Sequence, residues 1–71
     1  MEVYLVTEAI PGDQVEVRAV FKDLTDACSF AREQAQIQLG DKAKDSFDGG
    51  ELEYSDDCTG YVIWIDEQTV N

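Results

Sequence analysis

The side chains that could do chemistry in this 71-residue sequence are few in type. Sixteen Asp and Glu accompany five Lys and Arg, two Cys and no His. Without His, a Ser–His or Cys–His pair cannot form and the commonest general base is missing. Two carboxylates can hydrolyse a sugar, but among sixteen acids some pair falls at a suitable separation by chance. We therefore expect a protein that is not an enzyme and that uses no cofactor.

The segment from Asp41 to Gly50 is the best candidate for a metal-binding loop. Carboxylate oxygens are the ligands that Ca²⁺ prefers, and three Asp lie in this segment. Their uneven spacing and the two lysines between them do not match the Asp-x-Asp-x-Asp-Gly pattern of an EF-hand. We expect a solvated acidic loop that binds no metal.

Two cysteines, Cys28 and Cys58, indicate a reducing compartment, because small secreted scaffolds usually carry more. Whether the two are paired stays open. The start of the chain, Met1 to Tyr4, lacks the basic and apolar regions of a secretory signal. No run approaches the roughly 18 apolar residues of a membrane span. We expect a complete cytoplasmic chain that forms a single domain, residues 1–71.

Two β-type runs near the start predict a hairpin. Val3–Thr7 is rich in strand formers, and apolar and polar residues alternate over Val15–Phe21. Between them, Pro11 and Gly12 suit the two central positions of a type II turn.

The period of the apolar residues then changes to that of a helix. One apolar stripe within about 120° spans residues 24–39, and it is formed by Leu24, Ala27, Cys28, Ala31, Ala35 and Leu39. Asp23 is a suitable N-cap and Gly40 a suitable C-terminal stop.

Two further strands are predicted in the second half. Leu52 and Tyr54 alternate with polar residues, and Tyr61–Ile65 is apolar throughout, as in a central strand. Residues 55–60 connect them. The predicted fold is α+β, in the order ββαββ, with a four-stranded antiparallel sheet and one helix packed on one face.

Negative charge is concentrated toward the end of the chain. The formal net charge is -11, and residues 45–71 hold eight acids and no base. Six of these acids fall close together: Asp45, Asp48, Glu51, Glu53, Asp56 and Asp57. Glu51 and Glu53 are expected on one face of a strand, with Cα atoms about 6.7 Å apart, close to two phosphate steps of about 3.4 Å. Crowded like charges destabilise a fold, so they serve either recognition or solubility.

Four apolar residues are candidate anchors for a partner protein. Phe30 and Ile37 fall outside the helix stripe, where they form an interface or are covered by the 41–50 loop through Phe47. Tyr61 and Trp64 contribute aromatic character to the last strand. Aromatic side chains on the open sheet face would favour a protein-binding or dimer surface. Alternatively, they pack only against one another across strands.

The first half of the chain resembles a type of small bacteriophage-encoded protein. The resemblance is carried by Val3–Val6, Ala19–Asp23, Asp26-Ala27 and Phe30-Ala31, and it covers about the first 40 residues. In such proteins a hairpin precedes a helix. Phage proteins of this size and acidity often inhibit host enzymes, and several anti-restriction, anti-CRISPR and DNA-glycosylase inhibitors are acidic mimics of DNA. The resemblance implies an inhibitor that acts in the host cytoplasm.

Together these patterns predict a non-enzymatic inhibitor whose acidic surface docks on a basic, nucleic-acid-binding groove of a host defence protein. Carboxylates would replace phosphates there and pair with Arg and Lys. The net charge argues against direct binding of nucleic acid. The alternative is a small accessory module that dimerises through its open sheet face, with acidity serving solubility only. The protein is expected to be a monomer or a homodimer: the first hypothesis does not need self-association, and the second requires it.

Overall fold

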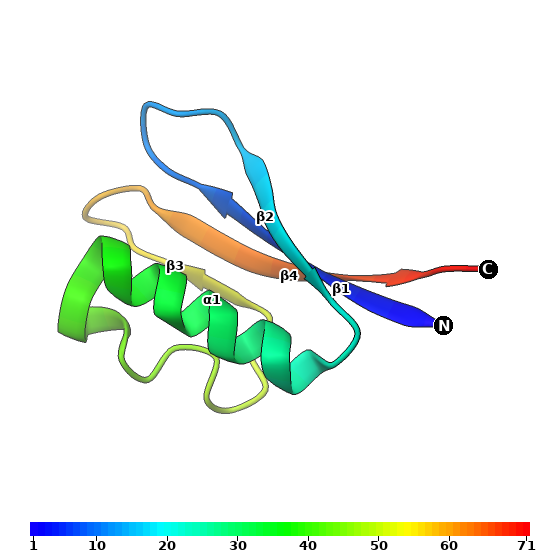
Figure 1. Ribbon diagram of the computed structural model, residues 1–71. Coiled ribbons are helices and arrows are strands. Elements are labelled where there is room, and N and C mark those ends of the chain that lie inside the picture. The colour runs from blue at the N-terminus through cyan, green and yellow to red at the C-terminus, as the bar shows by residue number, and fades with distance from the viewer.

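The chain folds into a four-stranded sheet and one long helix (Figure 1). The computed structural model describes residues 1–71. Its elements are β1 (Glu2–Ala9), β2 (Glu16–Phe21), α1 (Leu24–Leu39), the 3₁₀ helix η1 (Gly40–Ala43), β3 (Glu53–Ser55) and β4 (Val62–Thr69). The strand order is β2-β1-β4-β3, and every neighbouring pair is antiparallel. The predicted α+β fold is confirmed.

The β1–β2 hairpin turns at the predicted residues. The Asp13 N–H donates to the Ile10 carbonyl over 2.9 Å, and Gly12 has φ +88°, as a type II turn requires. The pairing contains one bulge: Val6 pairs with Ala19 and the next residue, Thr7, pairs with Val17. Arg18 is therefore an extra residue in β2, and a bulge of this kind redirects a side chain.

Helix α1 has the predicted bounds. Asp23 precedes it in an extended conformation, without a side-chain capping bond, and Gly40 ends it at φ +66°. Beyond α1, the expectation of a loop over residues 41–50 was wrong at its start, because η1 continues to Ala43. Neither helix is long and apolar enough to cross a membrane.

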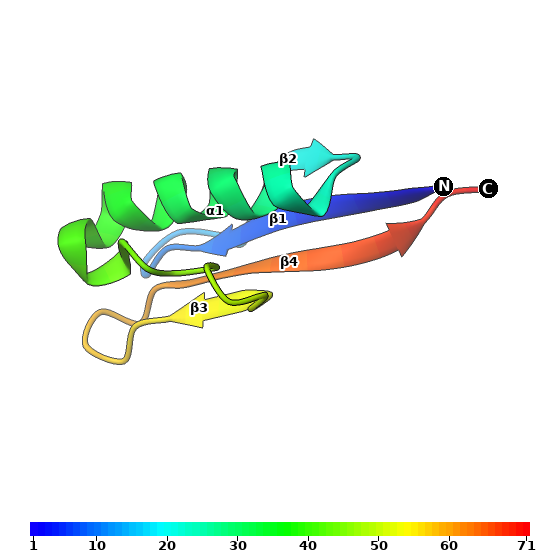
Figure 2. The ribbon, with the colours of Figure 1, turned by 90° about the horizontal axis from the view of Figure 1, so that it is seen from below.

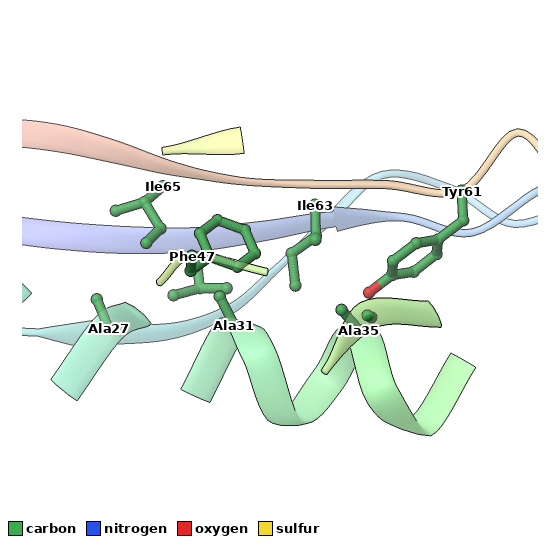
Figure 3. Close-up of a cluster of buried hydrophobic side chains, with 9 residues drawn as sticks. Ala27, Ala31, Ala35, Phe47, Tyr61, Ile63 and Ile65 are labelled. Atoms are coloured by element: carbon green, nitrogen blue, oxygen red, sulfur yellow. The ribbon is translucent and has the colours of Figure 1, made fainter. Parts of the chain in front are cut away.

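The core lies between α1 and one face of the sheet. Three alanines of the helix, Ala27, Ala31 and Ala35, are fully buried against Ile63 and Ile65 of β4 (Figure 3). Small residues let the helix approach the sheet closely. The ring of Phe47, from the segment after η1, fills the space beside the helix, and Phe47 adopts φ +59° to reach it.

The alanine stripe makes the helix sensitive to added volume. We expect Ala31→Leu to lower the free energy of unfolding by about 1–3 kcal/mol, because a close-packed core has no room for three more carbons. Urea unfolding followed by circular dichroism measures the change. Gln38→Leu, on the exposed side of the same helix, is the control and should change stability by less than about 0.5 kcal/mol. Equal stability of the two variants would contradict this packing.

Strand β4 is longer than the sequence predicted, and β3 is short. β4 runs on to Thr69, and its whole length pairs with β1, whereas β3 pairs only with Val62–Trp64. In Figure 2 the end of β4 extends well beyond β3, and the two chain ends lie side by side. The bond from Val70 N–H to the Met1 carbonyl, 2.7 Å, holds the two chain ends together.

Candidate protein-interaction surface

Carboxylates without a cation partner dominate the surface. The ion pairs within 4.0 Å involve four acids, Glu8, Glu16, Asp48 and Asp56, and the cations Arg18, Arg32 and Lys42. The other twelve of the sixteen acids have no Lys or Arg within that distance. Folding therefore pairs few of the acids with a cation, and of the other twelve Glu2, Glu51 and Asp66 accept only uncharged hydrogen-bond donors.

Asp56 is a structural residue rather than part of a docking surface. It is 8% exposed, and its carboxylate accepts bonds from Lys42 Nζ (2.7 Å) and from the Thr59 hydroxyl (2.8 Å) and N–H (3.1 Å). The bond from Lys42, then those from Thr59, hold the pKa of Asp56 below its ordinary value. The carboxylate therefore closes the β3–β4 loop and is already saturated with donors.

Asp48 is also engaged, though its carboxylate stays exposed. It lies 3.6 Å from the Arg32 guanidinium, which also donates to the carbonyls of Ser46 (2.9 Å) and Phe47 (3.4 Å). Arg32 thus fastens the segment after η1 to helix α1. Of the six acids grouped by sequence, two are paired with cations that fix this half of the fold.

The four remaining acids of the group form what we call the acidic edge: Asp45, Glu51, Glu53 and Asp57, all exposed. They lie on the β3 side of the molecule, in the segment that runs from η1 into β3 and the following loop (Figure 2). The expectation that Glu51 and Glu53 share a strand face was wrong, because β3 begins at Glu53. The Glu51 carboxylate instead accepts the Gly49 N–H over 2.6 Å. The structure therefore gives these carboxylates no regular strand spacing.

The two candidate helix anchors have different surroundings. Phe30 is half-buried and packs on Phe21 of β2, with ring centroids 5.4 Å apart. Phe30 therefore has cover from the sheet, through Phe21, while Phe47 is part of the core cluster against which Phe30 packs. Ile37 is 71% exposed and has no such cover.

The two aromatic candidates, Tyr61 just before β4 and Trp64 within it, point to opposite faces of the sheet. Tyr61 is 1% exposed and faces the helix beside Ala35 (Figure 3), so it cannot contact a partner. Trp64 pairs across from Thr7 and Glu53, on the face away from α1, and its indole N–H donates to the Asp66 carboxylate over 3.1 Å. Of these two aromatic residues only Trp64 is available to a partner, and its pairing with Glu53 places it between the open face and the acidic edge.

The open face of the sheet is partly apolar. Strand alternation and register place there the apolar residues Val3, Leu5, Ala9, Val17, Val20, Val62 and Trp64, together with Thr7, Glu53, Ser55, Asp66 and Gln68. Val17 and Val20 are more than half exposed, at 53% and 57%. This face lies next to the acidic edge and carries no helix.

A buried polar cluster escaped the sequence prediction. Glu8 is 2% exposed and accepts the hydroxyl of Tyr61 and, over 2.8 Å, the Nε of Arg18. The β2 bulge brings Arg18 to this side of the sheet. One signal was present in the sequence: Glu8 is in phase with Tyr4 and Val6, whose side chains face the helix. A carboxylate at an inward position requires partners.

Tyr61 makes stability depend on alkaline pH. Burial, then the bond to the Glu8 carboxylate, raise the pKa of the phenol above its ordinary 10.0. Its stabilising contribution is therefore complete below pH 10 and is lost as pH rises further. Unfolding then releases one proton, and the free energy of unfolding falls by about 1.4 kcal/mol per pH unit.

Urea unfolding of the wild type and Tyr61→Phe at several pH values above 10 measures this slope. In the variant, the free energy of unfolding should fall less steeply with pH, by about 1.4 kcal/mol per pH unit, because one proton fewer is released on unfolding. Cys28, whose pKa is also raised by burial, contributes equally to both proteins. Parallel slopes in the two proteins would show that Tyr61 does not titrate on unfolding.

One open cavity of about 400 Å³ lies between α1 and the segment after Phe47. Cys28 and Arg32 line it, together with the hydroxyls of Thr25 and Ser29. Arg32 is already bound to carbonyls and to Asp48, and the raised pKa of Cys28 favours a neutral thiol. Both cysteines are free, Cys28 half-buried and Cys58 exposed. No three Cys, Asp or Glu side chains converge in a way that would hold a metal ion.

The exposed chemistry of the chain is thus an acidic edge that adjoins an open, partly apolar sheet face. Glu53 and Trp64, paired across β3 and β4, lie where the two surfaces meet. Comparison with known proteins found no matching family model, curated protein or solved structure. The function is therefore inferred from the residues of this chain alone.

Proposed function

We propose that this chain is a non-enzymatic binding protein that docks its acidic edge on a basic, nucleic-acid-binding surface of another protein and blocks it. The observation that carries the proposal is the set of free carboxylates at Asp45, Glu51, Glu53 and Asp57. The nearby cations Arg32 and Lys42 pair with Asp48 and Asp56. Free carboxylates can replace phosphates in pairing with Arg and Lys.

Trp64 supplies the apolar part of this contact. Aromatic residues near the centre of an interface contribute most of its binding energy, and Trp64 is half-buried beside Glu53. Ile37, the most exposed large apolar residue of the chain, lies on α1, on the other side of the sheet from Trp64, and is not part of this contact. The free thiols of Cys28 and Cys58 fit a reducing compartment, so the proposed place of action is the cytoplasm.

Affinity capture from cell lysate, with mass spectrometry at low and high salt, tests the proposal. The expected partner is a nucleic-acid-binding protein whose capture weakens with salt, because exposed charge pairs are screened, and which duplex DNA displaces. Capture that is insensitive to both salt and DNA would refute a DNA-like acidic contact.

A second candidate function is self-association through the open sheet face. The exposure of Val17 and Val20 favours it, because strands of monomeric proteins usually present polar residues to solvent. Sedimentation at micromolar concentration distinguishes the two functions. A stable dimer that Val20→Lys dissociates would support this second function, and a monomer at all concentrations would exclude it.

A further inference from the structure

Half of β4 has no strand on its outer side. On the β3 side, the last bond to β4 runs from Ile65 N–H to the Leu52 carbonyl, 2.8 Å. The residues before Leu52 make no backbone bond to β4. β4 continues to Thr69, and residues 66–69 are exposed. Figures 1 and 2 both show this end projecting past β3 and α1. We call residues Asp66–Thr69 the free edge.

The direction of the backbone groups on the free edge follows from two observed bonds. Ile65 N–H points to the β3 side, and Val70 N–H points to the opposite side, toward Met1. Successive N–H groups of a strand alternate in direction. The N–H and carbonyl groups of Glu67 and Thr69 therefore face outward without a strand partner, whereas those of Gln68 bind β1.

The charges around the free edge select its occupant. Asp66 and Glu67 lie on it, Glu51 and Glu53 lie on the chain that precedes it along the same side, and residues 45–71 contain no Lys or Arg. A second copy of this chain pairing here would bring Asp66 and Glu67 of both copies together, and like charges across strands destabilise pairing. An extended segment that contains Lys or Arg would pair its side chains with these acids and its backbone with the unpaired N–H and carbonyl groups of the free edge.

We propose that the free edge binds a basic, extended segment of the partner protein by β-strand addition. This inference rests on the proposed function, since it describes how an acidic binding protein holds its basic partner. Backbone bonds to Glu67 and Thr69 supply the register, and the acids on both faces of the edge select the basic side chains. The same acids prevent edge-to-edge association between copies.

The test uses a capped heptapeptide in which lysine alternates with valine or threonine. Its control has the same sequence with alternate backbone amides N-methylated, which keeps the charge and removes the ability to pair as a strand. Amide hydrogen exchange of this protein, followed by NMR, should slow about tenfold or more at Glu67 and Thr69 with the first peptide. The methylated peptide should bind about tenfold more weakly.

Two variants at one position check the geometry. Thr69→Pro removes an outward N–H, which an edge strand tolerates, and it should weaken the heptapeptide about fivefold or more. Thr69→Val keeps the N–H and should bind like the wild type. If Thr69→Pro disturbs folding, the methylated peptide still provides the comparison in the intact protein.

Equal binding of the two peptides, or unchanged exchange at Glu67 and Thr69, would overturn strand addition. The proposed function has a separate failure. If strand addition fails while lysate capture still depends on the acidic edge, the partner binds through side chains alone. If capture does not depend on the acidic edge, the proposed function itself is wrong, whatever the peptides do.

Discussion

Replacing Glu8 with alanine is expected to lower the free energy of unfolding by about 2–3 kcal/mol. The substitution leaves the buried Tyr61 hydroxyl without its acceptor and removes the charged partner of Arg18. Loss of a buried pair can cost more, about 3–5 kcal/mol. The Arg18 side chain is one-third exposed and also binds Glu16 at 2.8 Å. Because Arg18 keeps this partner, the expected loss of stability is smaller than for a fully buried pair.

This loss is large for a chain of this size. A 71-residue domain has a total stability of about 4–10 kcal/mol, so the melting temperature should fall on the order of 10–20 °C. Thermal and urea unfolding measure the effect. Glu8→Gln is the matched control. Its amide carbonyl can still accept the Tyr61 hydroxyl, so this variant should lose less stability than Glu8→Ala. A change below about 0.5 kcal/mol for Glu8→Ala would contradict a structural role for the cluster.

Neutralising the acidic edge is expected to weaken partner binding about tenfold or more. The variant carries Glu51→Gln, Glu53→Gln and Asp57→Asn, three exposed residues that form no ion pair in the free protein. Each exposed charge pair contributes about 0.2–1 kcal/mol, and about 1.4 kcal/mol corresponds to a tenfold change in affinity. The fold should be unaffected, because the one bond these carboxylates make, from Gly49 N–H to Glu51, lies within a loop, and the amide oxygen that Glu51→Gln introduces can still accept it.

The matched control removes the same charge elsewhere. Asp13→Asn, Asp26→Asn and Glu33→Gln neutralise three exposed acids on the hairpin turn and helix. This variant should bind the partner like the wild type and precipitate no more readily than the acidic-edge variant. If both triple variants lose the same affinity, only the net charge matters. If neither loses affinity and both precipitate more readily, the acids serve solubility.

The elements with clear periodicity were predictable from the sequence. The stripe from Leu24 to Leu39 marks α1 residue for residue, and Pro11-Gly12 marks the first turn, because both signals are local. The end of β4 carried no such signal. Asp66 and Glu67 have low strand propensity, and they join the sheet because β1 is long enough to pair with them.

The direction of side chains in the second half was less predictable. In the uninterrupted apolar run from Tyr61 to Ile65, no alternation indicates which residues face inward. The direction of Tyr61 depends instead on Glu8, whose buried carboxylate needs a donor that the Tyr61 hydroxyl supplies. Similarly, the position of Phe30 depends on Phe21, a contact between separate elements that spacing along one helix cannot show.

The acidic candidates divided for the same reason. Asp56 and Asp57 are adjacent and alike in sequence, yet one is buried with Lys42 and Thr59 and the other is exposed. Only the closure of the β3–β4 loop separates their roles. Composition predicts a large excess of acids without a cation partner, whereas the identity of the structural acids required the long-range pairs.

Displacement of duplex DNA from the captured partner tests the proposed function most directly. A fluorescently labelled duplex is bound to that partner, and its anisotropy is followed as this protein is added. The wild type and the control triple variant should release the DNA at similar concentrations, and the acidic-edge variant should need about tenfold more. DNA that stays bound at saturating wild-type protein, or equal release by both triple variants, would contradict a DNA-like acidic contact.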